Sequence, residues 1–180
     1  MTMGTYLHLR ALLEQKYLEA KLERDMRFYI LCLLALETGA RVSDLLKLDW
    51  SSIDFNTAEV IYTNTKSKRR QFQRISSSLL NHIKRYKSTL EISRVFHSKI
   101  FYNSYKGSVL SRVTANRRTQ KELGMNFHQL RKEAGKNIAN QMGVVMASKY
   151  LGHSRVSTTD IYLGVSDDTY REQMANVRLD

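Results

Sequence analysis

Three short segments of the sequence carry arginine, histidine and tyrosine side chains that could together bind and cleave a phosphodiester. In the first segment, Arg41 follows a Thr-Gly-Ala run. In the second, His128 and Arg131 lie three positions apart, which on a helix places both side chains on one face. In the third, Tyr162 lies nine residues after His153. Each segment alone also has a structural explanation, since a tyrosine, one of ten here, ordinarily packs at a half-buried position.

The order of the three segments along the chain resembles that of the tyrosine recombinase, or phage integrase, family. Its first box is Thr-Gly-x-Arg with an acidic residue three positions later, its second is His-x-Leu-Arg, and its third is Leu-Gly-His followed by a threonine and a tyrosine. The matching residues are Thr38, Gly39, Arg41 and Asp44, then His128, Leu130 and Arg131, then Leu151, Gly152, His153, Thr159 and Tyr162. The match covers almost the whole chain.

The resemblance implies a reaction in which Tyr162 attacks phosphorus and forms a 3′-phosphotyrosyl link, with no metal ion or other cofactor. Arg41 and Arg131 would clamp the two non-bridging oxygens, because a guanidinium donates paired hydrogen bonds and stays charged at any working pH. His153 would add a further donor. A tyrosine has an ordinary pKa of about 10 and therefore needs a base, for which His128 is the candidate.

The family also uses a lysine on the hairpin between its second and third strands, which would protonate the 5′-oxygen leaving group. The corresponding loop here contains Lys66 and Lys68. Lys66 is the expected acid because it follows the predicted strand most directly, and Lys68 is the alternative. Asp44 is expected to orient Arg41 or a neighbour, since a carboxylate that faced the phosphate would repel it.

The charge of the chain favours a polyanionic partner. Its 29 Lys and Arg against 17 Asp and Glu leave a net charge of +12, and double-stranded DNA is the partner that the resemblance implies. An anionic membrane is disfavoured because the longest apolar run, Phe28 to Leu36, is too short to span a bilayer. The residues expected to contact DNA are Lys68, Arg69, Arg70, Arg112, Arg117 and Arg118.

Hydrophobic periodicity predicts an α+β fold, mainly helical, with helices around a small three-stranded antiparallel sheet. Helices are expected at residues 6–22, 25–38, 41–48, 78–90, 111–123, 127–141, 144–151, 157–162 and 168–177. Strands are expected at residues 53–55, 59–63 and 71–75. The apolar run Phe28 to Leu36 is predicted to be a core helix.

The whole chain, residues 1–180, is expected to form a single catalytic domain without the N-terminal core-binding domain that relatives usually carry, because only 40 residues precede Arg41. This is compatible with a catalytic fragment of a longer integrase or with a naturally short enzyme. The last predicted helix is expected to pack into a neighbouring protomer through Tyr170, Met174 and Val177, in a tetramer on DNA. A single cysteine, Cys32, and an N-terminus without a signal peptide favour the cytoplasm of a prokaryotic, archaeal or viral host cell.

Two other functions compete with recombination. A type IB topoisomerase or a telomere-resolving strand transferase would share the chemistry without exchanging strands between partners, although the short chain argues against both. A non-catalytic DNA-binding accessory protein would share the fold, but the presence of all six catalytic positions argues against it. Integration, excision, inversion and resolution are all compatible with these residues.

Overall fold

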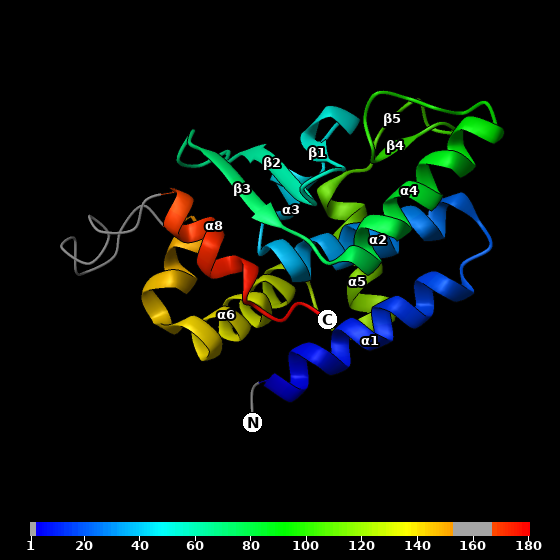
Figure 1. Ribbon diagram of the computed structural model, residues 1–180. Helices are drawn as coiled ribbons and strands as arrows, with labels where there is room; N and C mark the ends of the chain where they lie inside the picture. The colour runs from blue at the N-terminus through cyan, green and yellow to red at the C-terminus, as the bar shows by residue number, and fades with distance from the viewer. Residues whose placement is uncertain (1–2, 153–166) are drawn as a thin grey trace.

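The chain forms mainly helices, with a three-stranded and a two-stranded antiparallel sheet in the described part (Figure 1). The computed structural model describes residues 3–152 and 167–180. The helices are α1 (Met3–Glu19), α2 (Glu23–Thr38), α3 (Val42–Leu45), α4 (Ser77–Ile92), α5 (Arg112–Leu123), α6 (Phe127–Tyr150) and α8 (Asp167–Ala175), with a 3-10 turn, η1, at Trp50–Ser52. The strands are β1 (Ile53–Asp54), β2 (Glu59–Thr63), β3 (Arg70–Arg74), β4 (Tyr102–Asn103) and β5 (Ser108–Val109). The predicted fold class is confirmed.

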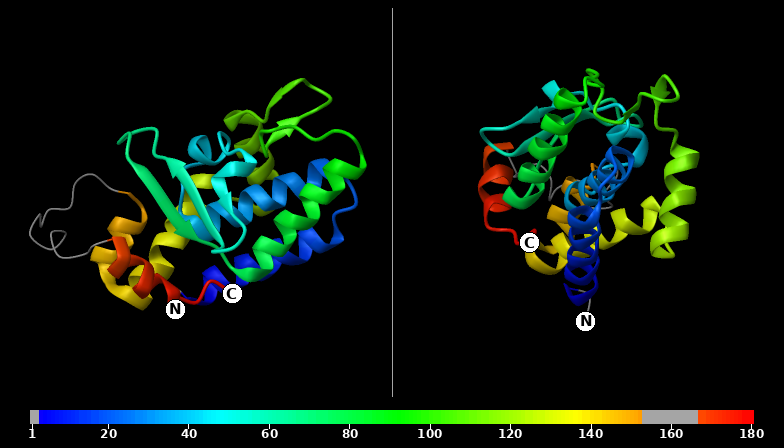
Figure 2. Two further views of the ribbon diagram at one scale, coloured as in Figure 1. Left: turned by 45° about the horizontal axis from the view of Figure 1, so that its top comes forward. Right: turned by 90° about the vertical axis from the view of Figure 1, so that its right-hand side faces the viewer.

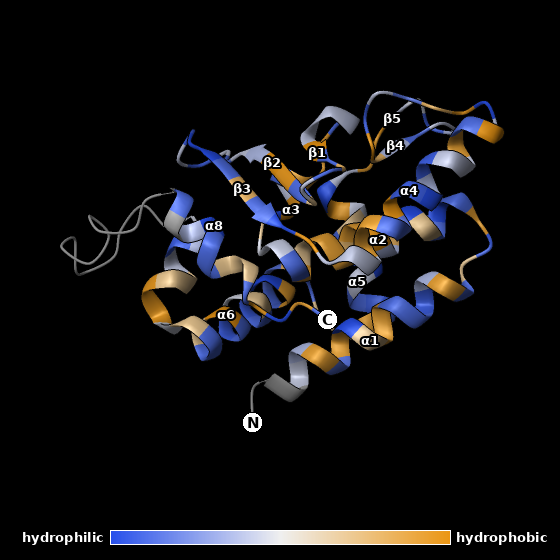
Figure 3. Cartoon of the chain, viewed as in Figure 1, coloured by the Kyte–Doolittle hydropathy of each residue, from blue (hydrophilic) through white to orange (hydrophobic). Residues whose placement is uncertain are grey.

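Helix α2 forms the centre of the core. Every residue from Met26 to Thr38 is buried, because α1, α4 and α6 all pack against this helix. A helix with apolar residues on all sides is stable only when it is surrounded in this way. Figure 3 shows apolar residues on α2 where it passes through the middle of the molecule. The prediction of a buried core helix at this run is therefore confirmed.

The three-stranded sheet lies on one side of the helices, as the turned view in Figure 2 shows (left). Its strand order is β1-β2-β3, and the register pairs Glu59 with Arg74 and Thr63 with Arg70. Strand β2 has the bounds that the sequence predicts. The β4–β5 hairpin was not predicted, because each of its strands has only two residues and no alternating pattern.

The predicted helix at residues 41–48 is wrong over its second half. Helix α3 ends at Leu45, and the chain then pairs with an extended segment that lies 50 residues further along. Ile100 donates its backbone N–H to the carbonyl of Leu48 over 3.1 Å, and Trp50 donates to the carbonyl of Ser98 over 3.2 Å. These long-range bonds replace the next helical turn, and they keep Leu48 buried without helical spacing.

Residues 127–141 and 144–151, predicted as two helices, are two helical segments that meet at a kink and share the label α6. Gly143 interrupts it with φ 84° and ψ 167°, a conformation that glycine tolerates and other residues rarely adopt. The turn of α6 that follows the kink carries Tyr150 to the end of α2. The predicted helix at residues 157–162 lies outside the described residues.

Helix α8 packs against its own chain. Tyr170, Met174 and Val177, the face predicted to enter a neighbouring protomer, are buried in a cluster with residues of α6. The Tyr170 hydroxyl donates a 2.7 Å hydrogen bond to the Oε1 atom of Gln73 on β3. At the end of the chain, the carbonyl of Leu179 accepts a hydrogen bond from the Tyr6 hydroxyl over 3.2 Å. In this conformation the apolar face is not available to a second subunit.

Candidate active site

An open pocket of about 560 Å³ lies where α3, α5 and α6 meet. Four of its lining side chains, Arg41, Arg112, His128 and Arg131, are predicted catalytic or DNA-contact residues. They come from elements that lie far apart in the sequence, and the fold brings them together. The pocket is therefore the candidate active site.

Arg41 takes its position from the turn that ends α2. Gly39 adopts φ 61° and ψ 11° there and closes the helix with a 3.1 Å hydrogen bond from its N–H to the carbonyl of Ala35. A Cβ atom at this position would lie 2.5 Å from the Cε1 atom of Tyr150. The turn thus needs glycine for both its conformation and its space. Arg41 follows in extended conformation as the residue that starts α3.

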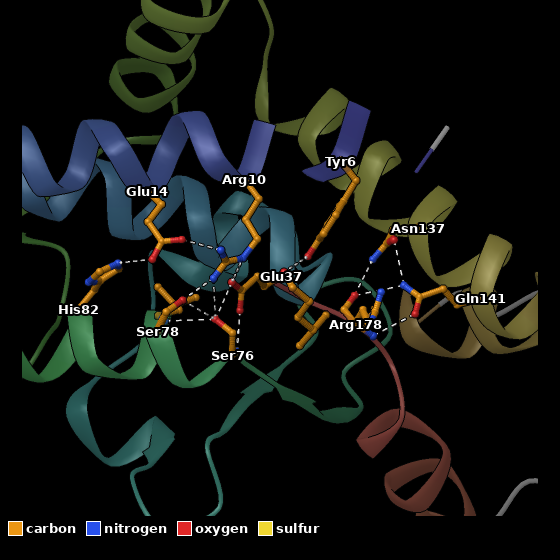
Figure 4. Close-up of polar contacts among 12 residues, drawn as sticks. Tyr6, Arg10, Glu14, Glu37, Ser76, Ser78, His82, Asn137, Gln141 and Arg178 are labelled. Atoms are coloured by element: carbon orange, nitrogen blue, oxygen red, sulfur yellow. Dashed lines mark hydrogen bonds and ion pairs between the residues drawn. The ribbon is translucent and has the colours of Figure 1, made fainter. Parts of the chain in front are cut away.

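A buried polar network holds the C-terminal half of α2 in place (Figure 4). The Glu37 carboxylate accepts hydrogen bonds from Arg10 Nε at 2.9 Å, from the Ser76 N–H at 2.8 Å and from the Ser76 hydroxyl at 2.8 Å. Burial raises the pKa of Glu37 to about 7, and the positive charge of Arg10 opposes that rise. Arg10 also pairs with Glu14 over 2.6 Å. The network anchors the turn that carries Arg41 to α1 and α4.

Arg131 connects all three sequence boxes. It lies in the first turns of α6, a helix whose start is fixed by a capping box between Asn126 and Gln129. Its Nη1 atom donates to the carbonyl of Gly39, and its Nη2 atom donates to the carbonyl of Leu151 over 2.6 Å. Because the side chain is only 8% exposed, its orientation is fixed by packing as well as by these bonds.

The electrostatics of the pocket favour an anion. Within the described residues, neither Arg41 nor Arg131 forms an ion pair with a carboxylate. The pKa of Arg131 is lowered from its ordinary value, first by burial and then by the positive charge of Arg41. Two positive charges that repel each other would both be stabilised by an anion bound between them.

His128 lies on the first turn of α6 and is exposed in the pocket. The predicted shared face with Arg131 is confirmed, since both side chains line the same pocket.

His153 and Tyr162 lie outside the described residues. The residue before His153, Gly152, adopts φ 62°, and a Cβ atom on it would lie 3.0 Å from the Nδ2 atom of Asn64. The third box therefore starts beside the β2–β3 hairpin.

The lysine loop between β2 and β3 lies outside the pocket lining. Lys66 and Lys68 are both exposed on it, and Lys68 has φ 58°. Asp44 is 2% exposed and accepts a 2.9 Å hydrogen bond from the N–H of Thr65, together with one from the Thr65 hydroxyl. These two hydrogen bonds hold the loop beside Arg41 and involve no atom of Arg41 itself.

Asn64 is a site residue that the sequence reasoning missed. It is buried, and its Oδ1 atom accepts a 2.9 Å hydrogen bond from Arg41 Nη1. An asparagine at the end of a strand is normally assigned to a turn, and 23 residues separate it from Arg41 in the sequence. Only its place just before the lysine loop could have drawn attention to it.

The predicted DNA-contact residues fall into two groups. Arg112 lines the pocket, and the exposed members of the set are Lys68, Arg69, Arg70, Arg112 and Arg117. Arg118 differs, because it pairs with Asp25 over 2.7 Å and Glu122 over 2.6 Å, and its guanidinium lies 4.2 Å from the centroid of the Phe28 ring. These contacts indicate a structural role for Arg118 between α2 and α5 and give no support to a phosphate contact.

The described ranges contain neither a metal-binding cluster nor a membrane-spanning helix. No group of three or more His, Cys, Asp or Glu side chains there could hold a metal ion. None of the helices in the same ranges combines the length and the apolar character needed to cross a bilayer.

Comparison with known proteins identifies relatives of the same kind as the sequence boxes indicate. The chain is 27% identical over 160 residues to the tyrosine recombinase XerA of Pyrococcus horikoshii, a match that covers 86% of this chain and 56% of that protein. The crystal structure of XerA recombinase superposes with a TM-score of 0.67 at 19% identity, over 94% of this chain and 62% of that one. The XerH site-specific recombinase bound to its difH substrate gives a TM-score of 0.64 at 16% identity, over 93% of this chain and 52% of that one.

The curated relatives are longer than this chain, which spans about half of their length. The sequence model of the phage integrase family matches residues 11–169, a range that includes Arg41, His128, Arg131 and Tyr162. The fold, the order of the boxes and the convergence of the two arginines on one pocket agree with that match. The chain therefore belongs to the phage integrase family of tyrosine recombinases, of which it has the catalytic domain.

Proposed function

We propose that this chain cleaves and rejoins double-stranded DNA through a covalent 3′-phosphotyrosine on Tyr162, as a site-specific recombinase. The observation that carries the proposal is the pair Arg41 and Arg131, two guanidiniums that share one open pocket, with no carboxylate partner in the described part of the chain. A phosphodiester supplies the anion that such a pair would bind, and its negative charge on the non-bridging oxygens increases in the transition state.

The proposed reaction assigns a proton to each step. The Tyr162 oxygen bonds to phosphorus as the bond from phosphorus to the 5′-oxygen breaks. His128, exposed in the pocket, accepts the tyrosine proton, and Lys66 gives a proton to the departing 5′-oxygen. A second 5′-hydroxyl then attacks the phosphotyrosine and reverses these transfers. His153 supplies a further donor to the phosphate.

Arginine chemistry makes the clamp suited to this transfer. Two of the five N–H groups of Arg131 bind the carbonyls of Gly39 and Leu151, so that the guanidinium is already oriented before DNA binds. Arg41 is oriented in the same way by Asn64. Donors that are held in place before reaction stabilise developing charge without reorganising.

The proposed partner is DNA in the cytoplasm of the host cell. Arg112 at the pocket, Arg117 on α5 and the loop residues Lys68, Arg69 and Arg70 are exposed and would contact phosphates along the duplex. The XerH relative was solved bound to its difH substrate, and lambda integrase was solved as a dimer bound to a core site. These relatives support a DNA substrate for this chain.

Assembly as a tetramer on DNA through the C-terminal helix is part of the proposal. The apolar face of α8 is buried against β3 and α6 of the same chain. A subunit would therefore have to release α8 from this position before it could place the helix on a neighbour. Sedimentation on site-containing DNA tests this step, and strand exchange by a strictly monomeric complex would contradict it.

A trapping experiment tests the chemistry. The Tyr162→Phe variant is used to select bound duplexes from a randomised pool, and a nicked form of the selected DNA is incubated with the unmodified chain. Denaturing electrophoresis should then show a covalent protein–DNA adduct that Tyr162→Phe does not form. No adduct on a tightly bound selected site would contradict the proposal and would leave a DNA-binding protein without cleavage activity.

A further inference from the structure

The side chain of Asn64 joins two parts of the site that have separate chemical tasks. Asn64 follows β2, is 2% exposed, and places its Oδ1 atom within hydrogen-bond distance of three donors. These are Arg41 Nη1 at 2.9 Å, the N–H of Lys66 at 3.0 Å and the N–H of Ser67 at 3.1 Å. Because all three partners are donors, the amide oxygen has to face them.

The backbone of Asn64 closes the same loop. Its N–H donates to the carbonyl of Arg69 over 2.9 Å, and its carbonyl accepts from the N–H of Lys68 over 2.8 Å. Asp44 binds the loop from the other side, through the N–H and the hydroxyl of Thr65. The loop backbone at Lys66 is thus fixed at both neighbouring residues, while the Lys66 side chain remains exposed.

We propose that Asn64 is a positioning residue that couples the phosphate-binding Arg41 to the loop of the leaving-group acid Lys66. A single acceptor atom fixes one edge of the Arg41 guanidinium and the backbone of Lys66. A shift of one group is therefore transmitted to the other, and the phosphate clamp and the acid keep a constant separation. This inference rests on the proposed function. It adds no reaction and concerns how two groups of the proposed reaction are held in position.

The chain offers a matched control at its second hairpin. Asn103 is an asparagine at the end of β4, and its Oδ1 atom accepts from the N–H of Tyr105 at 3.1 Å and of Lys106 at 3.4 Å. These are the same relative positions that Asn64 binds in its own loop. Asn103 does not line the pocket, so Asn103→Ala removes the same kind of turn without touching Arg41.

The first test needs no DNA and follows amide hydrogen exchange by NMR. Asn64→Ala should accelerate exchange at Lys66 and Ser67 at least about tenfold, and Asn64→Asp, which keeps an acceptor oxygen, should not. Arg41→Ala should also accelerate exchange at Lys66, whereas Asn103→Ala should leave it unchanged. If exchange at Lys66 is unchanged in Arg41→Ala, the coupling is contradicted, whether or not the chain cleaves DNA. Core amides of α2 serve as the control for folding.

The second test separates the acid from the clamp by changing the leaving group. A selected site is prepared with sulfur in place of the bridging 5′-oxygen, so that the bond from phosphorus to sulfur breaks and a thiolate departs. Because a thiol has a pKa of about 8.5, the departing thiolate needs no proton from Lys66. Asn64→Ala should slow cleavage of the oxygen substrate by about 10- to 100-fold. The same variant should slow cleavage of the sulfur substrate less.

The outcomes distinguish the inference from the proposed function. Asn64→Asp should be impaired equally on both substrates, because its loop is intact and its charge opposes the phosphate. An Asn64→Ala defect of the same size on both substrates would show that Asn64 acts on Arg41 alone, and cleavage at the unmodified rate would show that it acts on neither. Failure of the unmodified chain to cleave either substrate would count against the proposed function, and the exchange experiment would still decide the coupling.

Discussion

The Tyr150 hydroxyl donates a 2.7 Å hydrogen bond to the backbone carbonyl of Glu37, and its ring fills the space beside Gly39. This contact joins the end of α6 to the end of α2, so that the first and third sequence boxes meet in the core and not only at the surface. Tyr150 is also bound through its own carbonyl, which accepts a 2.7 Å hydrogen bond from Gln73 on β3. The site is therefore assembled on a rigid buried support.

Gly39→Ala should destabilise the fold by about 2–4 kcal/mol, the sum of an unfavourable left-handed backbone and a steric overlap with Tyr150. The added Cβ atom would lie 2.5 Å from the Tyr150 ring and 2.9 Å from Leu151. Gly124→Ala is the matched control, because Gly124 has a similar φ of 67° and nothing within 4 Å. Denaturant unfolding should show a smaller loss there, about 1–2 kcal/mol from the left-handed backbone alone. Equal losses in the two variants would contradict the steric part.

Arg112→Gln and Arg118→Gln should affect different properties of the chain, although both arginines lie on α5. Arg112 is exposed at the pocket, so its loss should weaken DNA binding and reduce the salt dependence of the affinity by about one phosphate contact. Arg118 is engaged by Asp25 and Glu122, so its loss should lower the melting temperature and leave the salt dependence unchanged. Titrations of selected DNA at several salt concentrations distinguish the two, and a reduced salt dependence in Arg118→Gln would contradict this assignment.

The difference between these two arginines illustrates how far the sequence could predict the site. Arg41, His128 and Arg131 were predictable because the turn glycine and the helical spacing are local properties and the order of the boxes resembles that of a known family. Arg118 was not, since its partner Asp25 is 93 residues away in the sequence, and a charged helix face looks the same whether it meets solvent or another helix.

The fold shows the same limit. The bounds of β2 follow from a local alternation of apolar residues, and the burial of α2 follows from its composition. The early end of α3 depends on a bond from Ile100 to Leu48, and the contact of Asn64 with Arg41 also joins distant segments. Tertiary contacts of this kind leave no periodic signal in the sequence.

Glu37 should make stability depend on pH between about 4.5 and 7. Burial raises its pKa in the folded chain to about 7, against an ordinary value of 4.5. The folded state then holds the proton more tightly than the unfolded state, so this contribution is fully present below pH 4.5 and is lost as the pH rises toward 7. The shift corresponds to a contribution on the order of 3 kcal/mol.

Glu37→Gln should remove this pH dependence, as urea unfolding at a series of pH values would show. The difference between the two proteins is the quantity to compare, because His82 gives a contribution of the opposite sign. Its pKa is lowered, chiefly by burial and against the effect of Glu14, so its contribution is gained as the pH rises. Parallel stability curves for the two proteins between pH 4.5 and 7 would rule out a raised Glu37 pKa.

Inorganic phosphate should stabilise the folded chain through Arg41 and Arg131, since its oxygens can accept hydrogen bonds from both guanidiniums at once. The pKa of Arg131 is lowered, after burial, by the charge of Arg41, and an anion that binds both guanidiniums reverses this effect. At ten times its dissociation constant, a ligand of the native state adds about 1.4 kcal/mol to the free energy of unfolding. Melting temperatures measured with phosphate and with chloride at equal ionic strength would show the gain. Arg41→Gln should abolish it and Arg118→Gln should retain it, because Arg41 lines the pocket and Arg118 does not. An equal gain in both variants would place the bound phosphate elsewhere.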